Sequence, residues 1–265
     1  MSDNLVIGGA TFTGVTGIKA TDTSDNVVTF MSGGYTASDW LDKTKPTGGA
    51  VLTYNGTDAP PTIARRTGTF SIVMPNCTSL SSDQQFAAAC SGLTGVTAPN
   101  LTTIQPTYAF AYTTSWTGAA FFPKATISGN AFRGSRVSVA VFYRVANANS
   151  SAFQDDTNLQ KVDQLSGYGF GATAFSGCTA LKTVVLRSTT LVALSNINHF
   201  NKTPFASGKA GGTLYVPQDL ISSYQSATNW STILGYGSGE QNQILPIEGS
   251  IYETQYADGT PIPTT

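Results

Sequence analysis

The sequence predicts a mainly β protein, in which a small N-terminal β module is followed by a short, irregular repeat solenoid with a C-terminal capping helix. Three observations support this fold class. Short apolar segments alternate with Gly, Asn and Pro turns over residues 1–75. A phenylalanine then recurs about every 22 residues. Near residue 217, a strand ending in Val-Pro runs into a segment with apolar residues at helical spacing.

Residues 1–75 are expected to form the N-terminal β module. Apolar stretches such as 27–31, 51–54 and 70–74 are short and rich in Val, Phe and Thr, as in strands. Asn55-Gly56 is the strongest hairpin signal among the turns, because both residues tolerate positive φ.

The middle of the chain contains an internal repeat marked by phenylalanine. The repeat positions are 24, 22, 21 and 22 residues apart, and each of the last four follows an alanine: Phe86, Phe110, Phe132, Phe153 and Phe175. In phase with them, a leucine follows three residues after Cys or Asp: Cys90 and Leu93, Asp156 and Leu159, Cys178 and Leu181. Such a period is typical of leucine-rich repeats, whose units bury their apolar faces against one another. We expect these residues to form structural ladders inside a solenoid spanning residues 76–235.

The units around Phe132 depart from this pattern. They lack the Cys-x-x-Leu feature, and residues 135–145 alternate like an ordinary strand. We therefore expect the middle of the solenoid to be irregular.

The segments AFSGCTALKTVVL at 174–186 and ACSGLTGVTAPNLTTI at 89–104 resemble the BspA-like class of leucine-rich repeat. The closing segment GGTLYVPQDLISSYQSATNWSTIL at 211–234 is similar to the end of such arrays. This resemblance covers roughly residues 75–235. It implies a module that displays loops or a concave sheet for recognition, and it implies no reaction and no cofactor.

The end of the array has the features of a cap. Pro217 can open a helix, Leu220, Ile221 and Tyr224 give it an apolar face, and Trp230 can cover the last rung. Residues 236–265 contain no repeat feature, so we expect an extended C-terminal tail that lies on a neighbour or is mobile.

The N-terminal stretch VIGGATFTGVTGIKATDTSDNVVTF is similar to the leader of virion proteins in tailed bacteriophages. With the repeats, it implies a non-enzymatic virion protein, either a capsid decoration or head fibre or a tail-associated protein. The implied partners are other virion proteins through the N-terminal module, further copies in a homo-oligomer, and a host-surface glycan or protein. No signal-peptide pattern is present, which agrees with assembly in the host cytoplasm and location in the virion.

Composition excludes several classes of partner. Charged residues make up 11% of the chain and the formal net charge is −1, so no basic patch for nucleic acid is expected. No run of about 18 apolar residues predicts membrane insertion. The three cysteines lack metal-site spacing and are interpreted as small buried residues.

No catalytic, metal-binding or cofactor-binding residue is predicted. His199 is the one histidine of the chain, and we interpret it as a polar surface residue because no catalytic motif surrounds it. The pair Asp155-Asp156 lacks further spaced oxygen ligands and is interpreted as a solvated turn.

An aromatic region around Phe110 gives the best candidate for a binding surface. Tyr108, Tyr112 and Trp116 lie there, and aromatic side chains supply contact area at low entropy cost. The alternative is that they pack between irregular repeats.

Two other functions stay open at this point. A bacterial cell-surface leucine-rich-repeat adhesin would need a signal peptide or a wall anchor. A carbohydrate-processing enzyme would need two carboxylates about 5 to 9.5 Å apart on a concave face, and the 15 acidic residues form no motif for or against this.

Overall fold

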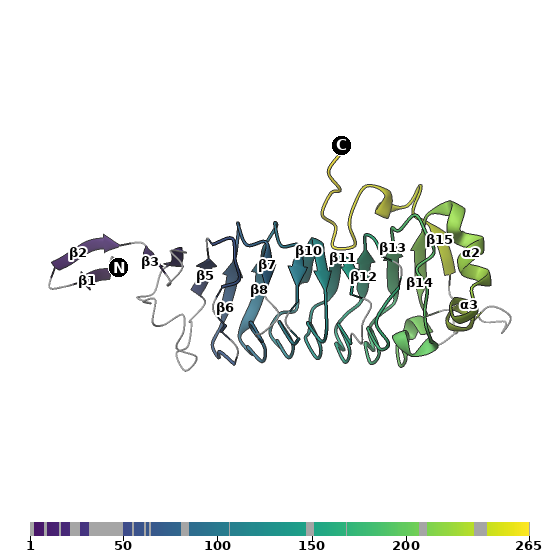
Figure 1. Cartoon of the computed structure of the whole chain (residues 1–265), viewed down its shortest axis with the longest axis horizontal. Coiled ribbons are helices and arrows are strands. Elements are labelled where there is room, and N and C mark those ends of the chain that lie inside the picture. Colours follow the sequence, from purple (N-terminus) through teal and green to yellow (C-terminus); the bar gives the residue numbers. More distant parts are fainter. Residues whose placement is uncertain are drawn as a thin grey trace.

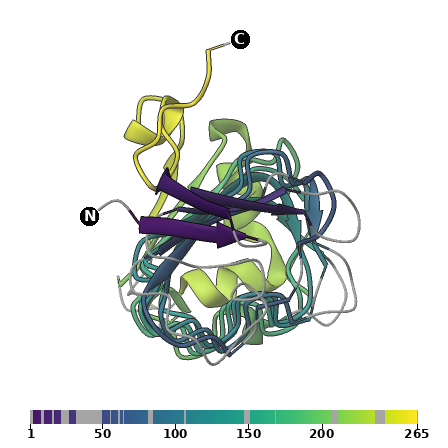
Figure 2. The same cartoon turned by 90° about the vertical axis from the view of Figure 1, so that its left-hand side faces the viewer.

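The protein is an elongated β-solenoid of stacked coils (Figure 1). The computed structural model describes residues 3–7, 10–15, 17–21, 27–31, 50–54, 56–60, 62–63, 65–80, 85–105, 107–146, 151–167, 169–206, 211–235 and 243–264, with the backbone alone up to residue 50. Viewed along the stack, the coils superimpose around one interior (Figure 2). No helix among these residues is long and apolar enough to cross a membrane.

The N-terminal strands change from antiparallel to parallel pairing at β5. A hairpin of β1 (Asp3–Ile7) and β2 (Ala10–Val15) comes first. A second sheet has the order β3 (Gly17–Thr21), β4 (Val27–Met31), β5 (Ala50–Tyr54), β6 (Phe70–Val73), β8 (Leu93–Thr97), and its pairs are antiparallel up to β5 and parallel after it. Because β6 pairs with β8, this sheet is continuous across residue 75, where the sequence analysis ended the N-terminal module.

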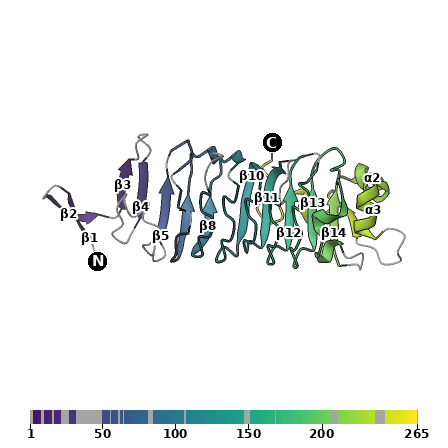
Figure 3. The ribbon, with the colours of Figure 1, turned by 60° about the horizontal axis from the view of Figure 1, so that its bottom comes forward.

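The main sheet is parallel throughout and runs along the rest of the stack (Figure 3). From one end to the other, its strands are β7 (Ser79–Leu80), β9 (Thr103–Ile104), β10 (Ala119–Ile127), β11 (Val139–Val145), β12 (Lys161–Gln164), β13 (Thr183–Leu186), β14 (Thr213–Val216) and β15 (Gln243–Pro246). The register of β10 with β11 shifts between Phe122 and Thr126, so the ladder of hydrogen bonds is irregular in these middle units.

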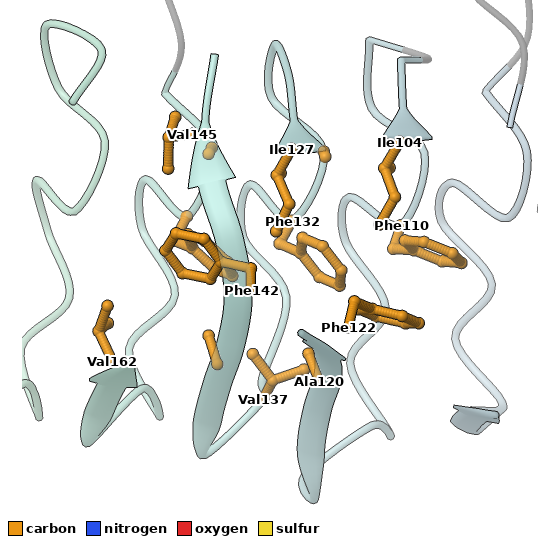
Figure 4. Packing of buried hydrophobic residues seen from close by; sticks show 14 of the residues in the cluster. Ile104, Phe110, Ala120, Phe122, Ile127, Phe132, Val137, Phe142, Val145 and Val162 are labelled. Atoms are coloured by element: carbon orange, nitrogen blue, oxygen red, sulfur yellow. The ribbon is translucent and has the colours of Figure 1, made fainter. Parts of the chain in front are cut away.

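A ladder of phenylalanine rings fills the interior. Phe132, Phe153, Phe175 and Phe200 stack in sequence, with centroids 5.1, 5.7 and 5.2 Å apart and interplanar angles of 10°, 11° and 16°. Phe110 stacks on Phe132 at 5.2 Å. Figure 4 shows Phe110 and Phe132 pointing into the interior beside Phe122 and Phe142, which come from the strands. Stacking across coils makes each unit depend on its neighbours for burial.

The backbone hydrogen bonds give the phase of the repeat. At each turn, the N–H of the ladder residue donates to the carbonyl that precedes the ladder residue of the next coil, and the ladder is Ile63, Ala87, Phe110, Phe132, Phe153, Phe175, Phe200. The sequence assignment was therefore one residue early at Phe86, whose neighbour Ala87 holds the ladder position. Phe86 is still buried, and it meets Phe110 edge to face at 5.8 Å.

A second, polar row lies three residues after each ladder position and is buried inside the turns. It comprises Arg66, Cys90, Thr113, Ser135, Asp156, Cys178 and Thr203. The thiols of Cys90 and Cys178 donate to carbonyls of the preceding coil, each at 3.0 Å. The hydroxyls of Thr113 and Thr203 donate to the ladder carbonyl of their own turn. Four members of the row thus donate side-chain hydrogen bonds to backbone carbonyls inside the turns.

The leucine positions come three residues after the polar row and are buried too. Leu93, Leu159 and Leu181 are fully buried in the common cluster. Trp116 occupies the same position after Thr113, is 1% exposed, and donates from Nε1 to the Ala119 carbonyl at 3.1 Å. Its indole replaces leucine and meets the rings of Phe110 and Phe132 edge to face.

Helical segments lie at the C-terminal end of the stack. They are η1 (Ile197–Phe200), η2 (Pro204–Ala206), η3 (Gln218–Leu220), α2 (Ile221–Ser226) and α3 (Thr228–Leu234). Trp230 of α3 is 1% exposed, lies 5.8 Å from Phe200 between ring centroids, and donates from Nε1 to the Val192 carbonyl at 2.6 Å. The hydroxyl of Tyr224 accepts from the Val192 N–H.

The C-terminal segment, residues 247–264, differs from the extended tail that the sequence analysis expects. It contains η4 (Ile251–Glu253) and an antiparallel bridge between Gln255 and Pro261, and it folds back over the outside of the main sheet (Figures 1 and 2). Ile247, Tyr252 and Ala257 form a small buried cluster with Val185 there. Residues 236–242 of the predicted tail lie outside the described residues.

Candidate functional site

The turn edge of the solenoid presents one residue per coil in the left-handed backbone region. These residues, here called the turn-edge row, follow two positions after each ladder residue: Arg65, Ala89, Tyr112, Gly134, Asp155, Gly177 and Lys202. The N–H of each one up to Gly177 donates to a carbonyl of the next coil at 2.7 to 2.9 Å. The row is therefore a straight ladder with rungs about 4.8 Å apart.

Bulky residues alternate with glycine in the centre of the row. A Cβ on Gly134 would lie 2.8 and 2.9 Å from two ring atoms of Tyr112. A Cβ on Gly177 would in the same way overlap Oδ1 of Asp155. Each glycine therefore leaves room for the side chain of the preceding coil, which lies over it.

This arrangement exposes Tyr112 as a fixed aromatic platform. Its side chain is 48% exposed, and its position is set by Gly134 on one side and by its own backbone φ of 59°. An aromatic ring that is held in place loses little entropy on binding and can stack on a sugar ring or a planar group.

Charged side chains flank the platform. The guanidinium of Arg133 lies 3.8 Å from the carboxylate of Asp155, and both side chains are partly exposed. Lys202 continues the row four coils beyond Tyr112. In a chain with 11% charged residues, one edge thus combines a ring, an ion pair and a further cation.

A cavity of about 130 Å³ lies at the C-terminal end of the row. Its lining combines amide, hydroxyl and ammonium groups with apolar side chains: Ile197, Asn198, Asn201, Lys202, Ala206, Thr232 and Ile233. Ile197 is 47% exposed at its rim.

The three aromatic residues that were predicted as a binding surface have different environments. Tyr112 is exposed, Tyr108 is half-buried with φ at 69°, and Trp116 is in the core. Trp116 is therefore removed from the predicted surface, because it fills a leucine position. The repeat residues from Phe86 to Leu181 that were assigned to the structural core are all buried in one cluster.

His199 is buried, which corrects its interpretation as a surface residue. Its Nδ1 faces the Gly171 carbonyl at 2.5 Å, and its Nε2 lies 3.2 Å from the Ser195 hydroxyl. Because a carbonyl oxygen can only accept, Nδ1 carries the proton and Nε2 accepts from Ser195. Burial lowers the pKa of His199, which favours the neutral ring. In a catalytic triad, a carboxylate accepts the hydrogen bond from Nδ1 of the histidine. In this protein a backbone carbonyl accepts it, so His199 has a structural role and connects two turns.

Asp156 is buried as well, so the prediction of a solvated Asp155-Asp156 turn is wrong for Asp156. Its carboxylate accepts from the Ser135 hydroxyl at 2.7 Å and from the Asn158 N–H at 3.1 Å. Burial raises the pKa of Asp156 to about 7, and these hydrogen bonds oppose the shift. Burial also raises the pKa of the Cys178 thiol, so this neighbour remains a neutral thiol.

The described residues contain no group of three or more His, Cys, Asp or Glu side chains placed to hold a metal ion. What the turn edge offers is recognition by stacking, hydrogen bonding and charge. The glycines of this edge were not predicted from the sequence, although Phe132-Arg-Gly134 and Phe175-Ser-Gly177 each have a glycine two residues after the ladder position.

Comparisons with known proteins add no relative to this picture. No protein-family model, curated protein or solved structure matches the chain.

Proposed function

We propose that this chain is a non-enzymatic virion protein of a tailed phage that displays its solenoid to bind glycans on the host surface. The observation that carries the proposal is the turn-edge row, where the exposed Tyr112 ring, the Arg133–Asp155 pair and the cavity beside Lys202 follow one straight edge.

The low content of charged residues also supports display on a particle. Long charged side chains lose rotamer freedom at every contact between packed copies, whereas Ser, Thr, Asn and Gly lose less. The chain replaces most surface charge with these residues. In this proposal the repeats belong to the BspA-like leucine-rich class, and homo-oligomers form on capsid or tail.

The two ends of the chain have different roles in this proposal. Residues 1–75 act as an anchor to other virion proteins. Helices α2 and α3 act as the cap of the solenoid, because Trp230 lies against the last phenylalanine of the ladder, Tyr224 packs on Trp230, and both bond to the backbone at Val192. A cap of this kind shields the final apolar rung from water.

The test is binding of the full chain to an array of bacterial surface glycans. We expect wild-type binding to at least one glycan class and a loss of about tenfold or more in affinity for Tyr112→Ala, in line with the cost of losing one stacking ring of about 1.5 kcal/mol. Tyr143→Ala is the matched control, since Tyr143 is also exposed, at 41%, but lies on β11. Binding that is the same in all three proteins would contradict the assignment of the site.

Localisation is tested separately by electron microscopy of phage particles labelled with antibody against the chain. Label on the head indicates decoration or a head fibre, and label on the tail indicates a role in host attachment. Particles without label would refute the virion proposal and favour a cell-surface adhesin.

A further inference from the structure

The C-terminal segment is bound to the solenoid as a separate unit. Its apolar side chains Ile247, Tyr252 and Ala257 form a cluster distinct from the interior cluster, which contains no described residue after Ile244. The segment also has hydrogen bonds of its own, from Tyr256 N–H to the Thr260 carbonyl and from Ile262 N–H to the Thr254 carbonyl. It can therefore leave the sheet without opening the phenylalanine ladder.

The surface under the segment is an outer row of the main sheet that runs across the five strands β10 to β14. Strand register aligns its members as Phe121, Val141, Asp163, Val185 and Tyr215. Rings of the segment meet both ends of the row: Tyr256 lies 5.4 Å from Phe121 and Tyr252 lies 4.6 Å from Tyr215 between ring centroids. Apart from Asp163, the row consists of apolar and aromatic side chains, and Tyr252 and Tyr256 of the segment pack against it.

An ion pair in the centre of the row binds the backbone of the segment. Arg187 holds Asp163 through two hydrogen bonds of 2.7 and 2.8 Å. The same guanidinium donates to the Tyr252 and Gln255 carbonyls at 2.6 and 2.8 Å, while Asp163 accepts from the Ala257 N–H at 2.9 Å. Three charge-assisted contacts to main-chain groups are a peptide-recognition arrangement.

The strand that connects the segment to the solenoid is weakly packed. No residue of β15 is buried, whereas the preceding strand β14 buries Leu214 and Val216. β15 pairs with β14 at the end of the sheet, and an edge strand of this kind can be supplied by another chain. Residues 243–264 therefore form a detachable unit made of an edge strand and a docking segment.

We infer that copies of this chain join by exchanging this unit, so that residues 243–264 of one copy pair with β14 and dock on the outer row of another. Exchange of an identical element repeats the same contacts in the dimer and is a low-cost route to association. The inference specifies the contact of the homo-oligomer in the proposed function and rests on that part of it. Its occupant is a second copy, and its site is the outer row with Asp163 and Arg187.

The test is crosslinking between two full-length variants. Tyr215→Cys places a thiol on the sheet of one copy, and Tyr252→Cys places one on the segment of the other. The native cysteines Cys77, Cys90 and Cys178 are buried and give little background. The two variants are mixed, incubated at several concentrations or refolded together, and treated with a short bismaleimide.

Exchange predicts a crosslinked heterodimer that increases with concentration and, after joint refolding, approaches the intrachain yield of the double variant Tyr215→Cys/Tyr252→Cys. Arg187→Ala in the copy that carries Tyr215→Cys should reduce the yield of heterodimer several-fold. As a control, Tyr215→Cys is replaced by Thr97→Cys on the exposed face of β8, and this variant should give no crosslinked heterodimer. An intrachain product without any heterodimer, no product at all, or an equal product with Thr97→Cys would each overturn the inference. Glycan binding and particle labelling do not depend on this crosslink, so they fail or succeed independently.

Discussion

Phe175 has ring neighbours on two sides within the ladder, Phe153 at 5.7 Å and Phe200 at 5.2 Å. Phe175→Ala should leave a cavity between two stacked rings and lower the free energy of unfolding by about 3 to 5 kcal/mol. Urea unfolding followed by far-UV circular dichroism measures this change. Tyr108→Ala, at a half-buried position outside the ladder, should cost much less, and equal losses would reject the ladder as the main source of stability.

Gly134 has a φ of 62° and supports the Tyr112 ring. Gly134→Ala should destabilise the protein by more than about 1 kcal/mol, because the new Cβ meets the ring and the backbone is strained. In a Tyr112→Ala background the ring contact is absent and the backbone strain remains, so the same change should cost less. A thermal-melting double-mutant cycle measures the difference, and strictly additive effects would contradict the contact.

Single core residues could be predicted from the sequence where the same residue type recurs in each coil. They could not be predicted where a different residue type occupies the repeat position. Phe110, Phe132, Phe153 and Phe175 could be found by spacing alone. Phe200 could not, because it lies 25 residues after Phe175 and follows His199 where the others follow alanine. Trp116 at a leucine position has no spacing signal of its own, since only the stacked coils show which position an aromatic residue fills.

At the scale of the single turn, Asp156 makes stability depend on pH. Burial raises its pKa from 3.8 to about 7 in the folded chain, so between these values the folded state keeps a proton that the unfolded state releases. Stability should therefore fall as pH rises from about 4 to about 7 and change little through this group above that range. Asp156→Asn should flatten this part of the profile in urea titrations at several pH values.

Asp163 acts in the same direction, since burial raises its pKa while Arg187 opposes the shift. The difference between wild type and Asp156→Asn isolates the buried turn from this second carboxyl. An identical pH profile in the two proteins would show that Asp156 binds protons equally in the folded and unfolded states, which contradicts the raised pKa.

The elements themselves were predictable to different extents. Parallel strands after each Leu or Val of the repeat follow from local spacing. The fold of the C-terminal segment does not, because its contacts join residues far apart, such as Ala257 with Asp163 at 94 positions. The turn-edge site was half predictable: Tyr112 stood out as aromatic, but its platform depends on Gly134 from the next coil.

For the whole molecule, the ion pair of Arg187 with Asp163 decides whether the outer face of the main sheet is covered. Arg187→Ala removes the hydrogen bonds to Tyr252 and Gln255 and leaves Asp163 without its countercharge. We expect the Ala257 amide to exchange with deuterium as fast as in an unstructured peptide. Amides of the Phe153 and Phe175 turns should stay protected, as hydrogen-exchange mass spectrometry can report.

Arg136→Ala is the matched control, because Arg136 is exposed and lies in the connection that precedes β11. Protection of Ala257 should persist in this variant. Loss of protection along the entire chain in Arg187→Ala would mean that segment and solenoid unfold as one unit.

The hydrogen bonds between successive turns follow one rule from Ile63 to Phe200, whatever the side chain. A unit of about 22 residues could thus be duplicated or deleted between Phe132 and Phe175, and each new neighbour would meet the same donors and acceptors. The distance between the two ends of the protein would then change in steps of about 4.8 Å. The length of the solenoid can therefore change during evolution by whole coils, while the two ends of the protein stay the same.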